Sequence, residues 1–334
     1  MIFRRHHGNV AVPHMEGYAA PELASNASEG AFCFGRRKAM LHDPAKPELQ
    51  SLVIACVQME PHVGAKRDNV ARAIRHIETA ARNGASLVVL PELANTGYAF
   101  ANREEAFALA EALPDGETAR IFADTAQRLG IHLVTGIAER AGKRLYNSAL
   151  FTGPSGYIGV YRKLHLWNNE NLFFEAGDRG VPVFGTPLGR IAIAICYDGW
   201  FPETYRLAAM QGADIVCVPT NWVPMPSQPD DRSAMAATLT MAAAHSNGIA
   251  IACANRIGTE RGQPFIGQSL IVGGDGWPVA GPASVDREEI LYAVIDVKRT
   301  RSGRTLNTFN HVLRDRRADV YGRMLGTARS FCLA

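Results

Sequence analysis

The stretch 191–203 begins as an apolar, β-branched run that ends on a cysteine, Cys196. Such a run predicts a buried strand, and Asp198, Gly199 and Pro202 then predict a tight turn and the start of a helix. In open α/β sheets, ligands collect at the carboxyl ends of the strands, and free N–H groups there can stabilise a thiolate or an oxyanion. The sequence therefore offers Cys196 as a nucleophile; the alternative is a small buried apolar side chain, the usual place of a free cysteine.

A cysteine that attacks a carbonyl or nitrile carbon needs a base for its proton and a cation or N–H donors for the developing oxyanion. Glu92 directly follows the apolar run 87–91, and a carboxylate beside such a strand can have a raised pKa and act as a base. Lys163 and His165 follow another apolar run, 157–161. Each residue also has a structural interpretation: a helix cap or surface carboxylate for Glu92, a solvated charge for Lys163, and local hydrogen bonding for His165.

Apolar runs alternate with helical periodicity between residues 52 and 300, which indicates an α/β protein with a mixed or parallel sheet covered on its faces. No linker interrupts this part, and residues 167–180 are expected to form a loop. The expected strands are 52–57, 86–92, 131–137, 148–152, 157–161, 191–196, 214–219, 248–254, 267–272 and 290–297, and the expected helices are 68–82, 118–128, 202–210 and 233–245.

The composition is that of an ordinary water-soluble globular chain, with 334 residues, 47% hydrophobic residues and 20% charged residues. The net charge of +3 does not indicate binding to nucleic acid or an anionic membrane. No apolar run approaches the length of a membrane span. The six cysteines form no C-x-x-C pair, so no zinc or dithiol site is indicated, and a reducing, cytoplasmic setting is expected.

The two ends of the chain differ from its middle. Residues 1–50 mix His, Gly, Pro, Ala and Ser without periodicity, which predicts a poorly ordered extension, or a start annotated too far upstream, with Met40 as one alternative. Arg4-Arg5 precedes no apolar region, so a cleaved secretory signal is not expected. The expected organisation is therefore an extension over 1–50, a catalytic domain over 51–300 and a tail over 301–334.

Three short segments together resemble the signature segments of the nitrilase superfamily, the carbon–nitrogen hydrolases. They are Pro91-Glu92-Leu93, Tyr161-Arg-Lys-Leu-His165 and Ile195-Cys-Tyr-Asp-Gly-Trp-Phe-Pro-Glu203. The resemblance runs from about Leu52 to Asp296, and residues 314–321 are similar to the basic C-terminal segment of many members. It implies a four-layer α-β-β-α sandwich in which a helix-covered sheet forms each half.

The same resemblance implies roles for individual residues. Glu92 would be the general base, Lys163 the oxyanion stabiliser and Cys196 the nucleophile, with the backbone N–H of Tyr197 as a second oxyanion donor. The segment 170–178 matches the superfamily pattern E-x-x-x-F-x-x-G-D, which makes Glu170 a fourth functional residue. The implied mechanism passes through a thioester on the cysteine and needs no metal or organic cofactor.

The segment 196–203 is most similar to the C-W-D-Q-W-F-P-E motif of N-carbamoylputrescine amidases, with which it shares six of eight positions. It is also similar to the C-Y-D of omega-amidases, aminopentanamidases and aliphatic amidases. The expected substrate is a neutral or cationic linear amide or N-carbamoyl amine, a small molecule cleaved at a non-peptide C–N bond. Trp200, Asn221 and Trp222 are the expected pocket walls, with plain packing as the alternative.

Other functions stay open at this point. The chain could be a nitrilase, an inactive superfamily member that serves as a binding protein, or a redox-sensing thiol protein on another α/β fold. The redox interpretation assigns no role to Glu92 or Lys163, and the intact set of Glu92, Lys163 and Cys196 argues against the inactive member. Superfamily members commonly form homo-oligomers, so at least a dimer is expected, with residues 301–334 as a candidate interface.

Overall fold

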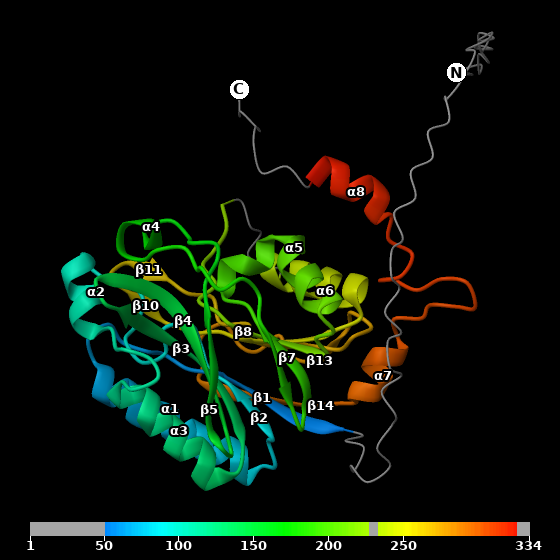
Figure 1. Ribbon diagram of the computed structural model, residues 1–334. Coiled ribbons are helices and arrows are strands. Elements are labelled where there is room, and N and C mark those ends of the chain that lie inside the picture. Colours follow the sequence, from blue (N-terminus) through cyan, green and yellow to red (C-terminus); the bar gives the residue numbers. More distant parts are fainter. Residues whose placement is uncertain (1–50, 227–232, 326–334) are drawn as a thin grey trace, which may run out of the picture. The chain divides into compact units, whose positions relative to one another are not determined.

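The computed structural model describes residues 51–226 and 233–325, so the expected N-terminal extension lies outside the described residues. A first mixed sheet carries the order β14-β1-β2-β3-β4-β5. Strand β1 pairs in parallel with β2 and antiparallel with β14, and β2 pairs in parallel with β3 (Figure 1). The strands of this sheet are β1 (Leu52–Gln58), β2 (Leu87–Val89), β3 (His132–Ala141), β4 (Arg144–Gly153), β5 (Gly156–Arg162) and β14 (Glu289–Ile295).

A second sheet has the same number of strands, in the order β13-β12-β9-β8-β7-β6. Its centre is parallel, because β7, β8 and β9 run in one direction, and its edges are antiparallel. A separate hairpin, β10 (Thr259–Glu260) and β11 (Gln263–Pro264), follows β9. The strands of the second sheet are β6 (Val183–Thr186), β7 (Gly189–Ile193), β8 (Ile215–Pro219), β9 (Ala250–Ala254), β12 (Leu270–Val272) and β13 (Pro278–Ala280).

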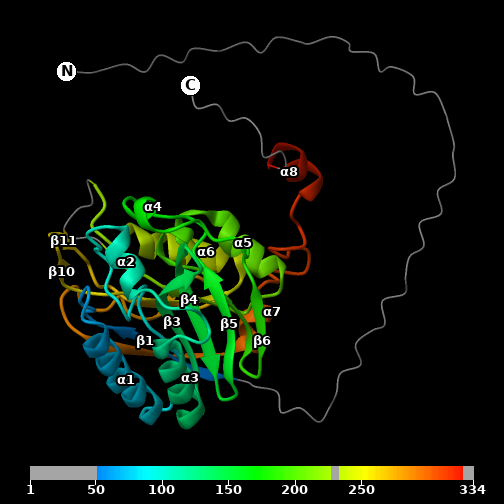
Figure 2. The same ribbon diagram turned by 60° about the vertical axis from the view of Figure 1, so that its left-hand side comes forward.

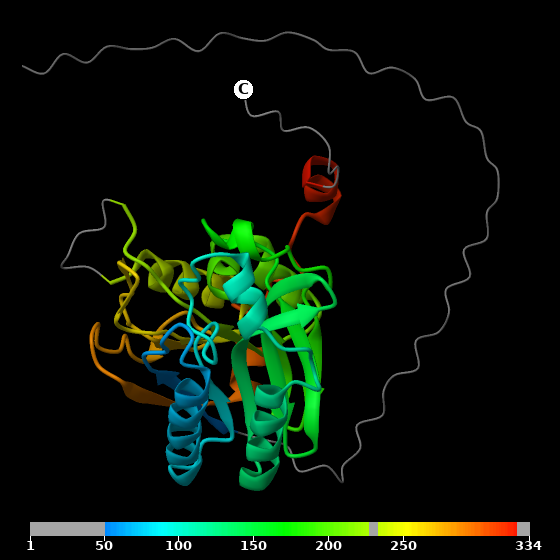
Figure 3. The ribbon, with the colours of Figure 1, turned by 90° about the vertical axis from the view of Figure 1, so that its left-hand side faces the viewer.

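Helices cover the outer face of each sheet. Helices α1 (Lys66–Arg82) and α3 (Glu117–Leu129) lie side by side against the first sheet, whereas α5 (Pro202–Met210) and α6 (Met235–Asn247) pack on the second (Figures 2 and 3). Strand β1 shows why the layers form, since its side chains alternate: Leu52, Ile54 and Cys56 enter the core between the sheets, and Ala55 and Val57 pack under the helices. The expected α-β-β-α sandwich is confirmed.

Several elements differ from the sequence prediction. The loop expected over 167–180 contains a short helix, α4 (Glu170–Phe173), and the last expected strand stops at Ile295 because Val297 begins α7 (Val297–Ser302). Helices α2 (Arg103–Leu109) and α8 (Ala318–Leu325) have no counterpart in the prediction. In the part of the chain that the structure describes, no helix is long and apolar enough to cross a membrane.

Gly136 of β3 permits a close approach between this strand and the segment that follows β2. Its N–H donates to Pro91 O at 3.1 Å, and its carbonyl accepts from Ala94 N at 3.1 Å. A Cβ atom at this position would lie 2.4 Å from Leu93 N and 2.5 Å from Glu92 Cα. The absence of a side chain at Gly136 therefore sets the position of the backbone that carries Glu92.

We expect Gly136→Ala to lower the free energy of unfolding by about 1–3 kcal/mol, as overpacking of a filled site does, and to reduce catalysis by displacing Glu92. The matched control is Gly185→Ala on β6, where a Cβ atom would meet nothing within 4 Å. Urea unfolding and initial rates measured on both variants check this expectation. Equal stability and activity in the two variants would contradict it.

Candidate active site

The site is built around an ammonium group held between two carboxylates. Lys163 Nζ lies 2.5 Å from Glu92 Oε1 and 2.7 Å from Glu170 Oε1. All three residues are buried, with 1% of Glu92, 1% of Lys163 and 4% of Glu170 exposed. Buried charges are stable only when they are paired and hydrogen-bonded, so these contacts hold the three side chains together.

Different elements bring these side chains together. Lys163 directly follows β5, Glu92 comes three residues after β2, and Glu170 opens α4. Two amides fix Glu92: Asn147 Nδ2 donates to its Oε1 at 2.7 Å, and Asn221 Nδ2 donates to its main-chain oxygen at 3.0 Å. The solvated-charge interpretation of Lys163 and the surface interpretation of Glu92 therefore do not fit, because both side chains are inside the protein.

The sequence pattern predicted a strand that ends at Cys196, but in the structure this strand ends earlier. Strand β7 stops at Ile193, and Cys196 begins a 3₁₀ turn over Cys196–Trp200 with a φ of 45°. A non-glycine residue in this left-handed region is strained, and such strain persists where the surroundings over-determine the backbone. The Cys196 side chain thus projects from a sharp turn between a strand and helix α5.

Asp198 ties this turn to the segment that carries Lys163. Its fully buried carboxylate accepts from Ile195 N at 2.9 Å, Tyr161 OH at 2.7 Å and His165 N at 3.0 Å. His165 Nδ1 also lies 2.8 Å from Asp198 Oδ1, and the imidazole ring stacks on Phe201. His165 therefore forms local hydrogen bonds, as its structural interpretation predicted.

The surroundings keep the thiol of Cys196 protonated at rest. Burial, and after it the negative charge of Glu92, raise the pKa of this thiol well above its usual value, although Lys163 opposes the shift. Burial also raises the pKa of Glu92 to about 7, against the opposing effects of Lys163 and Asn147. Burial works to lower the pKa of Lys163, but the charges of Glu170 and Glu92 outweigh it and raise that pKa, so the amine stays charged. A neighbouring carboxylate that titrates near neutrality can take the thiol proton.

Some hydrogen-bond donors and acceptors at this site have no partner within the described part of the chain, and they indicate where a reacting group can bind. An ammonium has three N–H donors, and the two carboxylates use two of those on Lys163, which leaves a third for another acceptor. Glu92 Oε2 and Glu170 Oε2 are buried and have no hydrogen-bond partner among the described residues. The backbone N–H of Tyr197 lies in the first turn of the 3₁₀ helix, where N–H groups lack partners within the helix.

Two pockets lie at this site, and Trp167 lines both of them. The smaller, about 20 Å³, borders Cys196 and contains the three expected wall residues, Trp200, Asn221 and Trp222. The larger, about 350 Å³, borders Glu170 and is lined also by Tyr98, Phe100 and Gln263. Trp167 therefore borders both the pocket beside Cys196 and the pocket beside Glu170.

Several residues at this site were not expected from the sequence. Trp167 lies in the segment expected to be a plain loop, and Asn147 lies in a strand that pairs with β5. Tyr98 OH donates to Glu170 Oε1 at 2.7 Å across a separation of 72 residues. Polar side chains beside predicted strand ends were the available signal for Asn147, whereas the contact of Tyr98 depends on how two loops fold. Among the described residues, no group of three or more His, Cys, Asp or Glu side chains could hold a metal ion.

Comparison with known proteins identifies the class of protein. Residues 53–305 match the carbon-nitrogen hydrolase family, so the chain belongs to that family and is a hydrolase of non-peptide C–N bonds. It is 41% identical over 270 residues to a protein named nitrilase from Pyrococcus abyssi, covering 81% of this chain and 99% of the relative. It is 34% identical to the N-carbamoylputrescine amidase of Solanum lycopersicum, covering 77% and 89%.

A solved structure in the same superfamily carries a modified cysteine. It is a glutamate-to-glutamine mutant of the amidase from Nesterenkonia sp. AN1, showing the Michael addition of acrylamide at the active-site cysteine. The fold matches with a TM-score of 0.66 and 25% sequence identity, covering 82% of this chain and 99% of that one. The expected membership of the nitrilase superfamily is thereby confirmed.

If Glu92 is the general base that the resemblance implies, kcat/KM should fall as the pH drops through about 7, because a base must be ionised to accept a proton and burial raises the pKa of Glu92 to about 7. Asn147→Ala removes a donor that lowers this pKa, so the midpoint should move to higher pH. Asn83→Ala, which removes an exposed bond to Tyr292, is the control and should not move it. A midpoint for Asn147→Ala equal to or below that of the unmodified protein would contradict the assignment.

Proposed function

We propose that the chain hydrolyses a small linear amide or N-carbamoyl amine through a thioester on Cys196. The observation that carries this proposal is the ammonium of Lys163, which lies 2.5 Å and 2.7 Å from two buried carboxylates in the site that also holds Cys196. Base, cation and nucleophile thereby occupy one water-poor site, where fixed charges act strongly on reacting groups. The modified cysteine of the Nesterenkonia amidase supports a covalent mechanism.

The first half-reaction makes the thioester. Glu92 takes the proton of the Cys196 thiol, and the sulfur adds to the substrate carbonyl carbon. The third N–H of Lys163 and the backbone N–H of Tyr197 hold the oxygen as its negative charge develops. When the tetrahedral intermediate collapses, its C–N bond breaks, and ammonia or an amine leaves with the proton that Glu92 had accepted.

The second half-reaction regenerates the thiol. Water enters, Glu92 takes one of its protons, and the oxygen adds to the thioester carbon. The same two donors hold the new oxyanion, the C–S bond breaks, and the sulfur recovers its proton from Glu92. Because one carboxylate serves both halves, its pKa near neutrality suits both directions of proton transfer.

The pocket walls support a neutral or cationic substrate. Tyr197 contacts Trp167 and Trp200 through its ring, with centroids 4.8 Å and 5.9 Å apart, so the space beside Cys196 is largely aromatic. Aromatic faces attract cations and accommodate alkyl chains. The similarity to the tomato N-carbamoylputrescine amidase also supports a substrate of this class.

Self-association into a dimer or larger assembly and a cytoplasmic location stay expectations.

Nitrile hydrolysis is the second candidate, and the name of the Pyrococcus abyssi relative favours it. An amide already carries the oxygen that Lys163 and the Tyr197 N–H would bind. A nitrile carries none, and its first adduct develops charge on nitrogen in a different direction. The same donors serve the amide better, which supports the amidase assignment.

We expect kcat/KM for an amide or N-carbamoyl compound to exceed that for the corresponding nitrile by at least about tenfold, equivalent to about 1.4 kcal/mol of transition-state stabilisation. The measurement is ammonia release from a linear amide and its own nitrile, side by side. Cys196→Ala is the control and should release none from either compound. Faster acid formation from the nitrile would overturn the amidase proposal and leave Glu92, Lys163 and Cys196 in their roles.

A further inference from the structure

We propose that Glu260 is a positioning residue for this reaction: together with Arg256 it holds the backbone of Tyr98, whose phenol fixes the carboxylate of Glu170 beside Lys163. The inference rests on the proposed function, since it assigns Glu260 a part in the rate of that reaction. Glu260 itself does not contact Cys196, Lys163 or Glu170 in the bonds that it forms.

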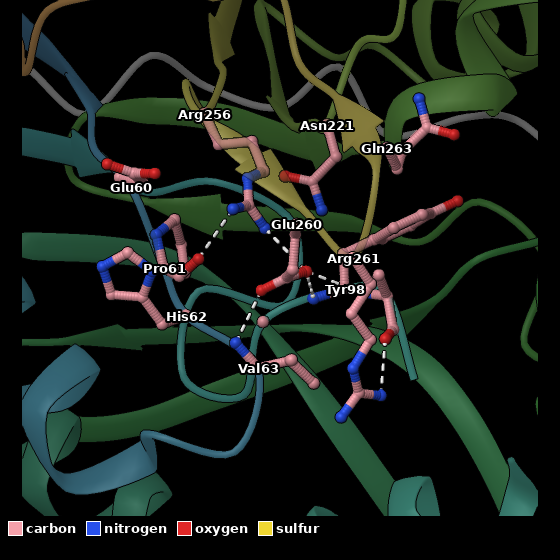
Figure 4. A network of polar contacts seen from close by, with 12 residues as sticks. Glu60, Pro61, His62, Val63, Tyr98, Asn221, Arg256, Glu260, Arg261 and Gln263 are labelled. Carbon is pink, nitrogen blue, oxygen red and sulfur yellow. Dashed lines mark hydrogen bonds and ion pairs between the residues drawn. The ribbon is translucent and has the colours of Figure 1, made fainter. Parts of the chain in front are cut away.

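Arg256 and Glu260 form a buried ion pair at the start of the β10–β11 hairpin. Arg256 Nη1 donates to Glu260 Oε2 at 3.1 Å, and only 1% and 5% of the two side chains are exposed. Arg256 Nη2 also donates to Pro61 O at 2.7 Å (Figure 4). The guanidinium lies 4.0 Å from the ring centroid of Phe265. The cation is thus fixed on several sides and sets the direction of the Glu260 carboxylate.

The carboxylate of Glu260 binds three backbone N–H groups from two different segments. Its Oε1 accepts from Val63 N at 2.6 Å, and its Oε2 accepts from Tyr98 N and Ala99 N, both at 2.7 Å (Figure 4). Gly97 makes this approach feasible, because a Cβ atom there would lie 2.6 Å from Glu260 Oε1 and 2.4 Å from Val63 N. Charge-assisted bonds of this kind are stronger than neutral ones, so the backbone at Tyr98 is firmly placed.

The side chain of Tyr98 connects the backbone that Glu260 binds to Glu170 in the active site. Its ring packs edge-on against Phe265, with centroids 5.8 Å apart, and the ring of Phe265 itself lies beside the Arg256 guanidinium. Burial, and after it the charge of Glu170, raise the pKa of Tyr98 well above its usual value, so the phenol keeps its proton. It can therefore donate to Glu170 Oε1 at 2.7 Å.

The carboxylate of Glu170 depends on the Tyr98 phenol because the short helix α4 alone does little to fix its orientation. Helix α4 spans only Glu170–Phe173, and Glu170 Oε2 has no partner among the described residues. Its Oε1 accepts from Lys163, which also binds Glu92, and from Tyr98. Without the phenol, the carboxylate of Glu170 can rotate and pull the ammonium away from the direction of the oxyanion. A misplacement of about 1 Å at a reacting centre can reduce a rate about 10²-fold.

The experiment compares Tyr98→Phe and Glu260→Gln with the unmodified protein on the amide that the protein turns over best. We expect kcat to fall about tenfold for Tyr98→Phe and about 10- to 100-fold for Glu260→Gln, with KM within about threefold. The matched control is Glu111→Gln, because Glu111 is also a buried carboxylate that accepts a backbone N–H, that of Thr118, and pairs with a cation, Lys66. It should lower stability and leave kcat unchanged.

A double-variant series separates positioning from a general loss of structure. In a Glu170→Ala background no carboxylate is left to position, so Tyr98→Phe and Glu260→Gln should each lower the residual rate by less than about twofold. Effects as large in that background as in the unmodified protein would overturn the proposal. Equal kcat values for Glu260→Gln and Glu111→Gln would do so as well. Tyr98→Phe keeps the ion pair intact, so if Glu260→Gln fails to fold, an unchanged kcat in Tyr98→Phe still overturns the proposal, because Glu260 could then not act through the phenol.

A crystal structure of Tyr98→Phe tests the inference without any substrate. We expect the Glu170 carboxylate to leave its place beside Lys163, with the separation between Oε1 and Nζ increasing beyond 3.5 Å. An unmoved Glu170 would contradict the positioning role. If the unmodified protein releases no ammonia from any amide or N-carbamoyl amine, the proposed function fails, and this crystallographic result still decides whether the Tyr98 phenol holds Glu170 in place.

Discussion

The ammonium of Lys163 between the carboxylates of Glu92 and Glu170 is the interaction on which the rest of the site depends. Removing three charged groups from water is costly, and close pairing of opposite charges with hydrogen bonds between them offsets that cost. Lys163 lies 2.5 Å and 2.7 Å from the two carboxylates, one from the segment after β2 and the other from the start of α4. Each carboxylate has a neutral donor on the same oxygen, Asn147 for Glu92 and Tyr98 for Glu170. The ammonium of Lys163 therefore orients the carboxylates of Glu92 and Glu170, and its third N–H can still bind a substrate.

The remainder of the fold brings a protonated thiol to this charged group. Cys196 follows β7 of the second sheet and Lys163 follows β5 of the first, and Asp198 joins the two segments by accepting from Ile195 N on one side and Tyr161 OH on the other. Burial raises the pKa of the thiol, so the sulfur is a poor nucleophile until a base takes its proton. Burial also gives Glu92 a pKa of about 7. The same exclusion of water thus makes a base necessary and makes Glu92 suitable for that task.

The amino-acid sequence predicted much of this arrangement, because apolar runs mark buried strands and reactive side chains follow them. Lys163 does follow β5, and the predicted helix 202–210 has the bounds of α5, since Pro202 begins it. The tight turn before α5 was predicted, but the end of β7 was placed too late, because Ala194 and Ile195 continue the apolar run although β7 stops at Ile193. Contacts across many residues escaped prediction. The bond from Tyr98 to Glu170 and the carboxylate of Glu260 beside Val63 arise from loop packing, which no local periodicity encodes.

The role of Lys163 can be measured directly as the rate at which Cys196 becomes acylated when Lys163 is replaced by an uncharged side chain of similar length. Lys163→Met fills the same space and leaves Glu92 and Glu170 without their cation. Rapid acid quenching followed by intact-mass measurement gives the rate at which the acyl adduct forms from an amide. We expect this rate to fall at least about 10²- to 10³-fold, as it does when one oxyanion donor is lost. Adduct formation in Lys163→Met at the rate of the unmodified protein would contradict this expectation.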